Sequence, residues 1–475
     1  MAITFVQTVA MVSMIVLLSG CGLTQKQKFE SYTKSYQQAN YCEAADIALG
    51  ERNLCDKKVE EIDVKDYDID EQLNAGTALF VAQKPEISNA LFASAADSIQ
   101  ESLNSKGIAR GTAEVMANAS MVDYNPMIMD SIYLHSYAMM NALALKDKKE
   151  VKIQVNRAHS VQQNAVKEFS KEIEKQKKEA AKEAAKIEEA EVRAANDRNV
   201  SNVLSNYREL AHWKGYKDFV NPYMTYLSGL YFMTNGSGNS DYETASNYLK
   251  RVLGMTAGNP YVKEDLNLAN RLANGHKNII EPTAWIIFEN GLISNFKELR
   301  LDLPVFLVTS EVKTVSVALP YPNEREAAYA NIYVSNGKKK VETKLLADMD
   351  SVFISEFYKR LPTIIAKEVA KITWQTAAQV VLRETTKDTN AALWGEIASY
   401  TVAAYSVFTA GADTRSWYSL PKNVQLAKIK KSGDALTFYI GAQELKVSVP
   451  KEGNSLIYVR VPAAGTIPTI NVIDL

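Results

Sequence analysis

The side chains that most often carry out chemistry are thinly spread along this chain. Its histidines are scattered without metal-ligand spacing, at His135, His159, His212 and His276. A His-Glu-x-x-His helix, a Gly-x-Ser-x-Gly turn and a phosphate-binding glycine loop do not occur in the sequence. The sequence therefore predicts a non-enzymatic protein with no catalytic residue, no metal site and no cofactor.

One acidic residue stands directly after an apolar stretch, in the run Phe288-Glu289-Asn290-Gly291. A carboxylic acid in a cleft could act on a glycan, but cleavage of a glycosidic bond normally requires a second carboxylate. The sequence does not identify such a partner, and a strand that ends in a turn explains the run as well. Glu289 is therefore a candidate ligand or partner contact.

The segment 412–421 is dense in side chains with directional bonding groups. Asp413 can cap a helix, Arg415 can form a two-pronged pair with a carboxylate, and Trp417 can wedge between layers. These residue types predict a structural corner between a helix and the strands that follow. Asp413, Arg415 and Trp417 are also the candidate partner or ligand contacts of this half of the chain.

Two of the three cysteines, Cys42 and Cys55, are close together in the sequence. In an oxidising compartment a disulfide that closes so short a loop would stabilise the fold by roughly 3 kcal/mol. Two buried thiols are the alternative. The spacing is not the Cys-x-x-Cys of redox folds.

The third cysteine follows an uncharged apolar run, 9–18. The run suits a removable secretory segment, whose apolar core has about 7–15 residues, better than a membrane span of about 20. Leu18-Ser19-Gly20-Cys21 resembles the lipobox of bacterial lipoproteins. The resemblance implies a signal peptide at 1–20, fatty acylation such as palmitate on Cys21, and a polar tether at 21–28.

The residue after the cysteine is Gly22 and not the aspartate that commonly retains such proteins at the inner membrane. In a Gram-negative host the resemblance therefore implies the periplasmic face of the outer membrane. Signal segments usually begin with a basic residue, whereas none precedes Lys26 here.

The composition is that of a globular protein long enough for two or three domains, with 47% hydrophobic and 23% charged residues among 475. Lys+Arg 54 and Asp+Glu 55 nearly cancel, so no overall basic field argues for nucleic acid. The expected fold class is α+β, with a helical half followed by a mixed domain.

In the first half, 29–275, apolar residues recur three and four positions apart, as on one face of a helix. Two pairs of such segments, within 73–99 and 223–253, are each joined by a short turn. The pairs resemble tetratricopeptide repeats, which predicts a tetratricopeptide-like helical domain over 29–275. An irregular helical bundle is the alternative.

Lys, Glu and Ala dominate the segment 147–196 of this half. Its weakly apolar seam has an approximate heptad spacing, which is typical of a coiled coil. One long solvated helix is the simpler expectation. The alternative is an arm that pairs with a partner or with a second copy in a homo-oligomer.

In the second half, 276–475, short β-branched runs predict strands in a mixed α+β domain. The expected strands are 285–288, 297–301, 315–319, 330–334 and 340–343, with Asn336-Gly337 as a hairpin turn and Pro304, Pro320 and Pro322 at strand margins. Five further strands are expected to form one small carboxy-terminal antiparallel sheet: 424–429, 435–440, 445–449, 456–461 and 467–473.

Two helices are expected between these groups of strands, at 362–383 and 391–412. The second helix has a length that suits a bilayer, but its hydroxyl side chains dilute its apolarity and no basic residues flank it. A buried helical hairpin is therefore the prediction. Membrane insertion of several copies as a pore is the alternative.

This order of segments resembles a family of bacterial outer-membrane lipoproteins with a tetratricopeptide-like helical half. The residues that carry the resemblance are the lipobox, the run 134–143, Phe288 to Gly291, Asp413 to Trp417 and Leu420-Pro421. The resemblance implies architecture and location and brings no catalytic residues.

The expected function is a lipid-anchored periplasmic scaffold or assembly factor. Its expected partners are proteins of an envelope machine for secretion, pilus, flagellar or cell-wall assembly, with the membrane contacted through the lipid. The alternative is an envelope enzyme or binding module that acts on peptidoglycan or another glycan through Glu289 and the residues near Arg415.

Overall fold

The computed structural model of this chain describes residues 25–104, 124–187, 190–256, 258–276, 280–306, 312–385 and 411–475. The predicted lipobox with Cys21 and nearly all of the predicted helix 391–412 lie outside these residues. Among the described helices, none combines the length and the apolarity that crossing a bilayer requires.

The first half of the chain is helical, as predicted. Its helices are α2 (Gln25–Gln37), α3 (Tyr41–Leu49), α4 (Ile69–Val81), α5 (Pro85–Asn104), α6 (Ile128–Ala144), α7 (Lys148–Ala185), α8 (Ala190–Ser205), α9 (Pro222–Asn235), α10 (Asn239–Met255) and α11 (Pro260–Ala273). Two of them begin at an Asn-Pro pair, where the asparagine side chain accepts bonds from the first backbone amides. Helix α4 packs on α5, and α9 packs on α10. A tetratricopeptide-like repeat of these pairs stays a prediction.

The described residues of the second half form three sheets and one long helix, α12 (Met349–Thr385). The strands are β1 (Thr283–Asn290), β2 (Asn295–Phe306), β3 (Val312–Asn323), β4 (Tyr333–Ser335), β5 (Lys340–Glu342), β6 (Lys344–Asp348), β7 (Asn423–Lys430), β8 (Ala435–Ile440), β9 (Gln443–Ser448), β10 (Ser455–Val461) and β11 (Thr469–Asp474). They form a five-stranded sheet in the order β11-β10-β1-β7-β6, a four-stranded sheet in the order β5-β4-β8-β9, and a two-stranded ribbon of β2 and β3.

Strand β1 is the centre of the five-stranded sheet and is buried on both faces. Its side chains alternate between two cores, as period two requires. Trp285 and Ile287 belong to a core shared with the helices, which extends from Tyr32 to Ile473. Ile286 and its neighbours on the opposite face pack against the four-stranded sheet. The central layer is therefore this sheet, with helices on one face and the second sheet on the other.

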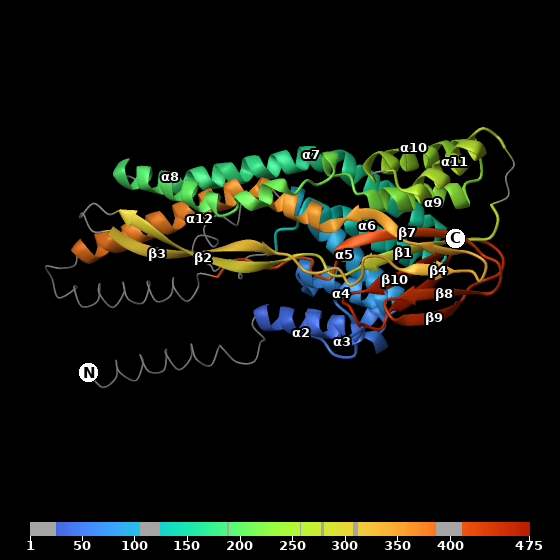
Figure 1. Cartoon of the computed structure of the whole chain (residues 1–475). Helices are drawn as coiled ribbons and strands as arrows, with labels where there is room; N and C mark the ends of the chain where they lie inside the picture. The colour runs from blue at the N-terminus through green and yellow to red at the C-terminus, as the bar shows by residue number, and fades with distance from the viewer. Residues whose placement is uncertain are drawn as a thin grey trace.

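Helices α7, α8 and α12 and the β2–β3 ribbon form an arm that extends to the left beyond the sheets in Figure 1. Helix α12 packs against α7, α8 and β3. The rings of Phe353 and Phe357 on α12 lie 4.8 and 4.9 Å from the ring of Phe296 on β2, which attaches the ribbon to the helix. The arm and the sheets thus belong to one packed structure.

Prolines do not mark strand margins in the ribbon, contrary to the prediction. Pro304, Pro320 and Pro322 pair within β2 and β3, opposite Thr314, Glu298 and Phe296. Each strand of a two-stranded ribbon has one free edge. A proline whose missing N–H would point to that edge interrupts no ladder bond.

The predicted helix 362–383 is also corrected, because α12 begins at Met349 and contains Pro362 in its interior. Phe353, Ile354 and Phe357 are buried in the main core. Packing of this kind, more than local propensity, stabilises helices in proteins and here carries the helix through the proline.

The single helix predicted over 147–196 is wrong, because the chain forms two helices, α7 and α8. Helix α7 ends at Ala185, and Ile187 buries its side chain directly after it. Burial of this apolar side chain accompanies the end of the first helix.

The five carboxy-terminal strands exist, but the prediction that they share one small antiparallel sheet is wrong. Strands β7, β10 and β11 join β1, and β10 runs parallel to it. Strands β8 and β9 instead extend the hairpin of β4 and β5, whose turn at Asn336-Gly337 is confirmed. The β1 pairing crosses long stretches of chain, which local patterns do not reveal.

Candidate functional site

Glu289 lies on β1, with its side chain on the face that the helices cover. Its carboxylate accepts hydrogen bonds from three tyrosine hydroxyls. Tyr133 on α6 donates at 3.1 Å, Tyr137 one turn later at 2.8 Å, and Tyr458 on β10 at 2.8 Å. The glutamate has 0% of its surface exposed. These bonds connect the central sheet to helix α6 at a buried point.

Arg460 is the cationic partner of this carboxylate and lies opposite Glu289 in the parallel register of β1 and β10. Its Nε is 4.0 Å from the Glu289 carboxylate, and both side chains have no exposed surface. The guanidinium also donates to the carbonyl oxygens of Gly291 at 2.6 Å and Ser419 at 3.1 Å, and to the Tyr36 hydroxyl at 3.2 Å. A buried arginine with this many acceptors holds several segments together.

Burial raises the pKa of Glu289, while Arg460 and the three tyrosine hydrogen bonds oppose that rise. The ring of Phe80 lies 4.8 Å from that of Tyr458 and closes part of the surroundings. The cluster is saturated with protein partners and has no solvent contact. In this structure Glu289 has a structural role, and its contact with a ligand or partner stays a prediction.

The corner at 413–418 is fixed to helices α4, α5 and α6 by Trp417, whose side chain is buried. The indole Nε1 donates to Thr77 Oγ1 on α4 at 2.8 Å. Its ring packs beside Phe92, Tyr133 and Tyr137. Trp417 therefore lies in the core between the helices and the segment before β7, where a ligand could not reach it without opening the core.

Arg415 and Asp413 lie at the outer side of this corner. The guanidinium forms a two-pronged pair with Asp413 at 3.0 and 2.8 Å and approaches Asp68 at 3.6 Å. Beside it is a cleft of about 70 Å³. The cleft is lined by Gln25, Lys28, Phe29, Ala48, Asp68, Asp70, Glu71, Thr414, Arg415 and Tyr418. The structure thus places Arg415 at a cleft, with Asp413 paired to it.

Asp70, on the first turn of α4, is the buried acid of this cleft and is 8% exposed. Burial raises its pKa to about 7, Arg415 opposes the rise, and Glu71, Asp68 and Asp413 add to it. Its Oδ1 accepts no hydrogen bond from the residues that the structure describes. This oxygen is itself buried, so it is an unsatisfied acceptor inside the fold and not one that the cleft exposes.

A second buried ionic cluster joins the arm to the body. Glu356 on α12 accepts hydrogen bonds from the amides of Ile128 at 2.6 Å and Met129 at 3.1 Å, at the start of α6. Arg360, one turn later, pairs with Glu356 at 2.8 Å and with Glu172 on α7 at 2.9 Å. Three helices therefore meet at one charge network.

The cysteine pair forms a disulfide between Cys42 and Cys55, one of the two arrangements that the sequence left open. Among the histidines, His135 is buried against Gln154, and burial lowers its pKa to about 4. Within the described ranges, no group of three or more His, Cys, Asp or Glu residues is arranged to hold a metal ion.

Sequence reasoning missed Arg460, the tyrosine hydroxyls around Glu289, and Asp70. Three signals were present, of which two were specific. Arg460 is a charged residue inside an otherwise apolar strand, and Tyr133 and Tyr137 are four positions apart on one helix face. The third signal, an acid in the first turn of a helix, is common and does not indicate a site by itself.

No protein-family model, no curated protein and no solved structure matches this chain.

Proposed function

We propose that this protein is a non-enzymatic, lipid-anchored scaffold or assembly factor on the periplasmic face of a bacterial outer membrane. Its arm holds an acidic protein partner that belongs to an envelope machine for secretion, pilus, flagellar or cell-wall assembly. The observation that supports this proposal most strongly is the charge distribution along α7.

The exposed face of α7 is basic, although the helix as a whole carries both signs of charge. Ten Lys or Arg residues of α7 are exposed, and Glu174 is its one exposed acid. The exposed basic residues are Lys148, Lys149, Lys152, Arg157, Lys167, Lys171, Lys175, Lys177, Lys178 and Lys182. Glu172 turns inward toward Arg360 and Glu183 is buried, whereas the other three acids of α7 are half-buried, and Glu168 pairs with Lys171 on the same helix. The helix therefore presents a basic surface that favours an acidic partner.

This basic surface is held on a rigid support. Helix α7 packs along α12 and α6, and the cluster of Glu172, Arg360 and Glu356 ties it to the start of α6. A surface that is already ordered loses less conformational entropy when a partner binds. Preorganisation of the basic face favours a binding role for the arm.

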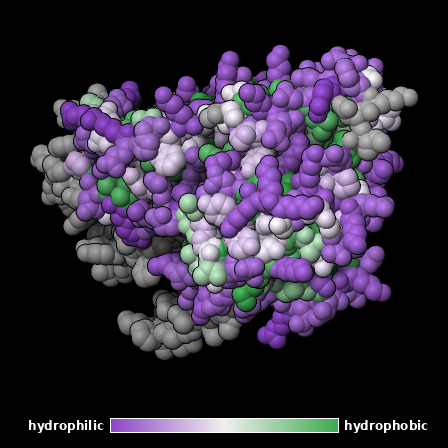
Figure 2. All heavy atoms as spheres, turned by 45° about the vertical axis from the view of Figure 1, so that its right-hand side comes forward, coloured by the Kyte–Doolittle hydropathy of each residue, from purple (hydrophilic) through white to green (hydrophobic). Residues whose placement is uncertain are grey.

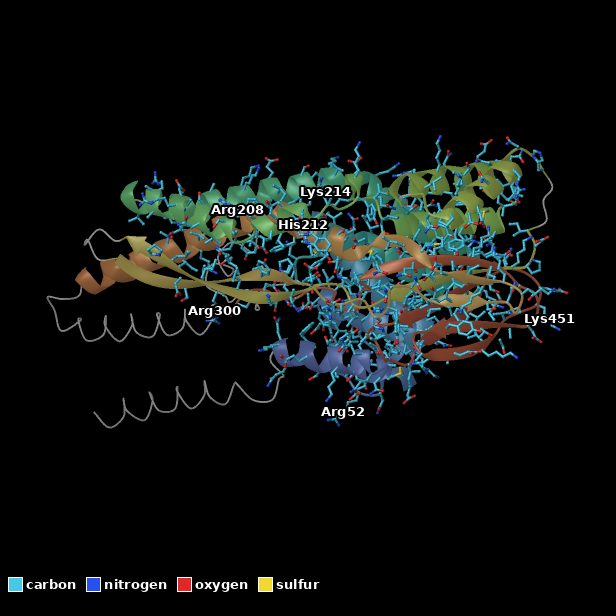
Figure 3. All side chains as sticks on the ribbon, in the orientation of Figure 1. Arg52, Arg208, His212, Lys214, Arg300 and Lys451 are labelled. Atoms are coloured by element: carbon cyan, nitrogen blue, oxygen red, sulfur yellow. A yellow bond between two sulfur atoms is a disulfide. The ribbon has the colours of Figure 1, made fainter. Side chains whose placement is uncertain are left out.

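Further basic side chains lie beside the arm. Figure 3 labels Arg208, His212 and Lys214 together in this region, on and directly after the short helix η5 (Arg208–His212), which contacts α12. Lys451 lies at the opposite end of the molecule. The face seen in Figure 2 is mostly hydrophilic, with apolar side chains in smaller areas between hydrophilic ones. Recognition by charge fits such a surface.

The position of α2 is consistent with anchoring at one side and binding at the other. In Figure 1, α2 lies at the lower side of the body and α7 at the upper side. Gln25 begins α2, four residues after the predicted lipidated Cys21. A chain held at Cys21 would therefore direct α7 away from the membrane. The disulfide suits an oxidising compartment outside the cytoplasm.

The alternative of a glycan-acting enzyme has less support. Its proposed acid, Glu289, is buried and bonded to Arg460 and three tyrosines. A substrate could reach this carboxylate only if α6 separated from the sheet.

The experiment that tests the proposal is photo-crosslinking in intact cells from a reactive residue placed at Lys175 on α7. Placement at Lys451 is the matched control, since both side chains are exposed lysines and Lys451 lies at the end of the molecule away from the arm that contains α7 (Figures 1 and 3). We expect a discrete cross-linked product from position 175 and none from position 451. Identical products from both positions, or none from position 175, would contradict the proposed role of the arm.

A further inference from the structure

Strand β9 is an outermost strand of the four-stranded sheet, and β8 is its one neighbour among the described strands (Figure 1). Proteins usually shorten, bulge or cover an edge strand, which prevents its pairing with another chain. The other edge strand of this sheet, β5, has three residues, and the edge strand β6 of the larger sheet has a register shift. Strand β9 has six residues in regular register and contains no proline. Its edge therefore lacks these protections.

The backbone groups on the outer side of β9 belong to its even-numbered residues. The amide of Val449 donates to the carbonyl oxygen of Asp434, directly before β8, at 2.9 Å. Along an antiparallel strand, successive residues direct their N–H and C=O groups alternately to the two sides. Glu444, Lys446 and Ser448 therefore direct these groups away from β8, where no other described segment supplies a backbone bond. A further strand could bond them.

The side chains of β9 fall into two sets. Leu445 and Val447 are half-buried at the margin of the core between the two sheets. Glu444 and Lys446 are exposed on the opposite face, one on each side of Leu445 in the sequence. A second, antiparallel β9 with its Leu445 opposite the first Leu445 places each Glu444 opposite a Lys446. Opposite charges in this position stabilise adjacent strands.

The same register also matches the free backbone groups. Glu444 and Lys446 both direct their amide and carbonyl outward, so they form a hydrogen-bonded pair, whereas the two Leu445 residues form a non-hydrogen-bonded pair. A shift by one residue would set an outward-directed residue opposite an inward-directed one. The neighbouring symmetric registers that keep the hydrogen bonds set Glu444 opposite Glu444, or Lys446 opposite Lys446, with like charges facing. The register centred on Leu445 satisfies both conditions.

We propose that two copies of this chain associate by antiparallel pairing of their β9 strands about a two-fold axis at Leu445. The pairing joins the two four-stranded sheets into one continuous sheet. A single strand pair is small beside the roughly 1,600 Å² of a standard interface, so the association is reversible and occurs at micromolar concentrations. The paired strands end at Ser448, which leaves α7 and Lys451 outside the interface. The inference therefore goes beyond the proposed function and does not depend on it.

Cysteine cross-linking of the purified full chain tests the position of the axis. Leu445→Cys places two thiols in the non-hydrogen-bonded pair, where the Cα atoms are about 4.5 Å apart and a disulfide can form. Val447→Cys is the matched control, because it is half-buried on the same face but lies four residues along the strand from its counterpart, about 14 Å away. We expect mild oxidation to give a reductant-sensitive dimer with Leu445→Cys and not with Val447→Cys. Equal yields from both variants, or no dimer from Leu445→Cys, would overturn the inference.

Exchange of charges tests the register without a new thiol. Glu444→Lys and Lys446→Glu should each weaken the dimer about tenfold or more, because each sets like charges opposite each other. Both side chains are exposed, so the variants should fold as the unchanged chain does. The combined variant restores opposite pairs and should recover the original affinity. Sedimentation velocity at up to about 100 μM measures all four proteins. An unchanged chain that stays monomeric, or a combined variant no tighter than the single ones, would contradict the proposed pairing.

Discussion

Replacing Arg460 with methionine tests the buried cluster around Glu289 directly. The guanidinium donates to the backbone carbonyl oxygens of Gly291, Glu289 and Ser419 and to the Tyr36 hydroxyl. Its removal leaves these four acceptors without this donor. The Glu289 carboxylate keeps its three tyrosine donors but loses its buried counter-charge. Breaking a buried ion pair by removing one partner costs about 3–5 kcal/mol, and we expect the free energy of unfolding to fall by that amount.

The size of the loss should depend on pH. Burial already raises the pKa of Glu289 above its ordinary value of 4.5, and Arg460 opposes the rise. Without Arg460 the pKa in the folded state rises further. A carboxyl group whose folded-state pKa is raised loses stability as pH increases from the unfolded pKa through the folded one. The deficit of Arg460→Met relative to the unchanged protein should therefore be smaller at pH 5 than at pH 8.

Urea unfolding followed by circular dichroism measures both effects. Arg300→Met is the matched control, because Arg300 also pairs with a glutamate but is 59% exposed, and its loss should cost at most about 1 kcal/mol. Adding Glu289→Gln to Arg460→Met should recover part of the loss, because the unpaired charge is then gone. A cost below about 1 kcal/mol for Arg460→Met, with no change between pH 5 and pH 8, would refute the reasoning.

Three further predictions follow from other buried groups. Cys55→Ser opens the disulfide with Cys42 and should lower the free energy of unfolding by about 3 kcal/mol, and reductant should then have no further effect on the thermal midpoint. His135 has a folded-state pKa of about 4 against an ordinary 6.5, so its contribution to stability should be complete above pH 6.5 and lost as pH falls toward 4. His135→Gln should remove this part of the pH dependence of urea unfolding. An unchanged pH profile in the variant would contradict the prediction. Glu356→Gln weakens two charge-assisted bonds to the start of α6 and removes one of the two carboxylates paired with the buried Arg360, so it should cost about 3–5 kcal/mol, with faster hydrogen exchange at Ile128 and Met129. Glu179→Gln, in a pair about 30% exposed, should leave both amides protected.

Local sequence patterns were sufficient to predict elements whose conformation depends mainly on neighbouring residues. The run from Trp285 to Phe288 is apolar on both faces, which is typical of a strand buried on both sides, and it became the central strand β1. Asn336-Gly337 supplied the left-handed conformation that a tight hairpin needs, with a φ of 84° at the glycine. These two predictions needed no knowledge of distant residues.

The parts of the fold and site that depend on distant pairing were not predictable. Glu289 and Arg460 are 171 residues apart, and the parallel pairing of β1 with β10 brings them together. The cleft combines Asp70 with Arg415 because Trp417 docks on α4 through Thr77. Nothing in the local sequence around either residue specifies that docking. The prolines of the ribbon and Pro362 of α12 misled for the same reason, since packing outweighed local preference.

The central claim, that the basic face of α7 holds an acidic partner, is tested most directly by charge reversal at three of its exposed lysines. Lys175, Lys177 and Lys178 are replaced with glutamate, and the control carries the same replacements at the exposed Lys338, Lys446 and Lys451 of the sheet region. The measurement is recovery of proteins that co-purify with the chain from solubilised envelopes at low and high salt. The account predicts that the α7 variant loses a salt-sensitive partner that the control retains. Retention of the same partner by both variants, or its absence from the unchanged protein, would contradict the claim.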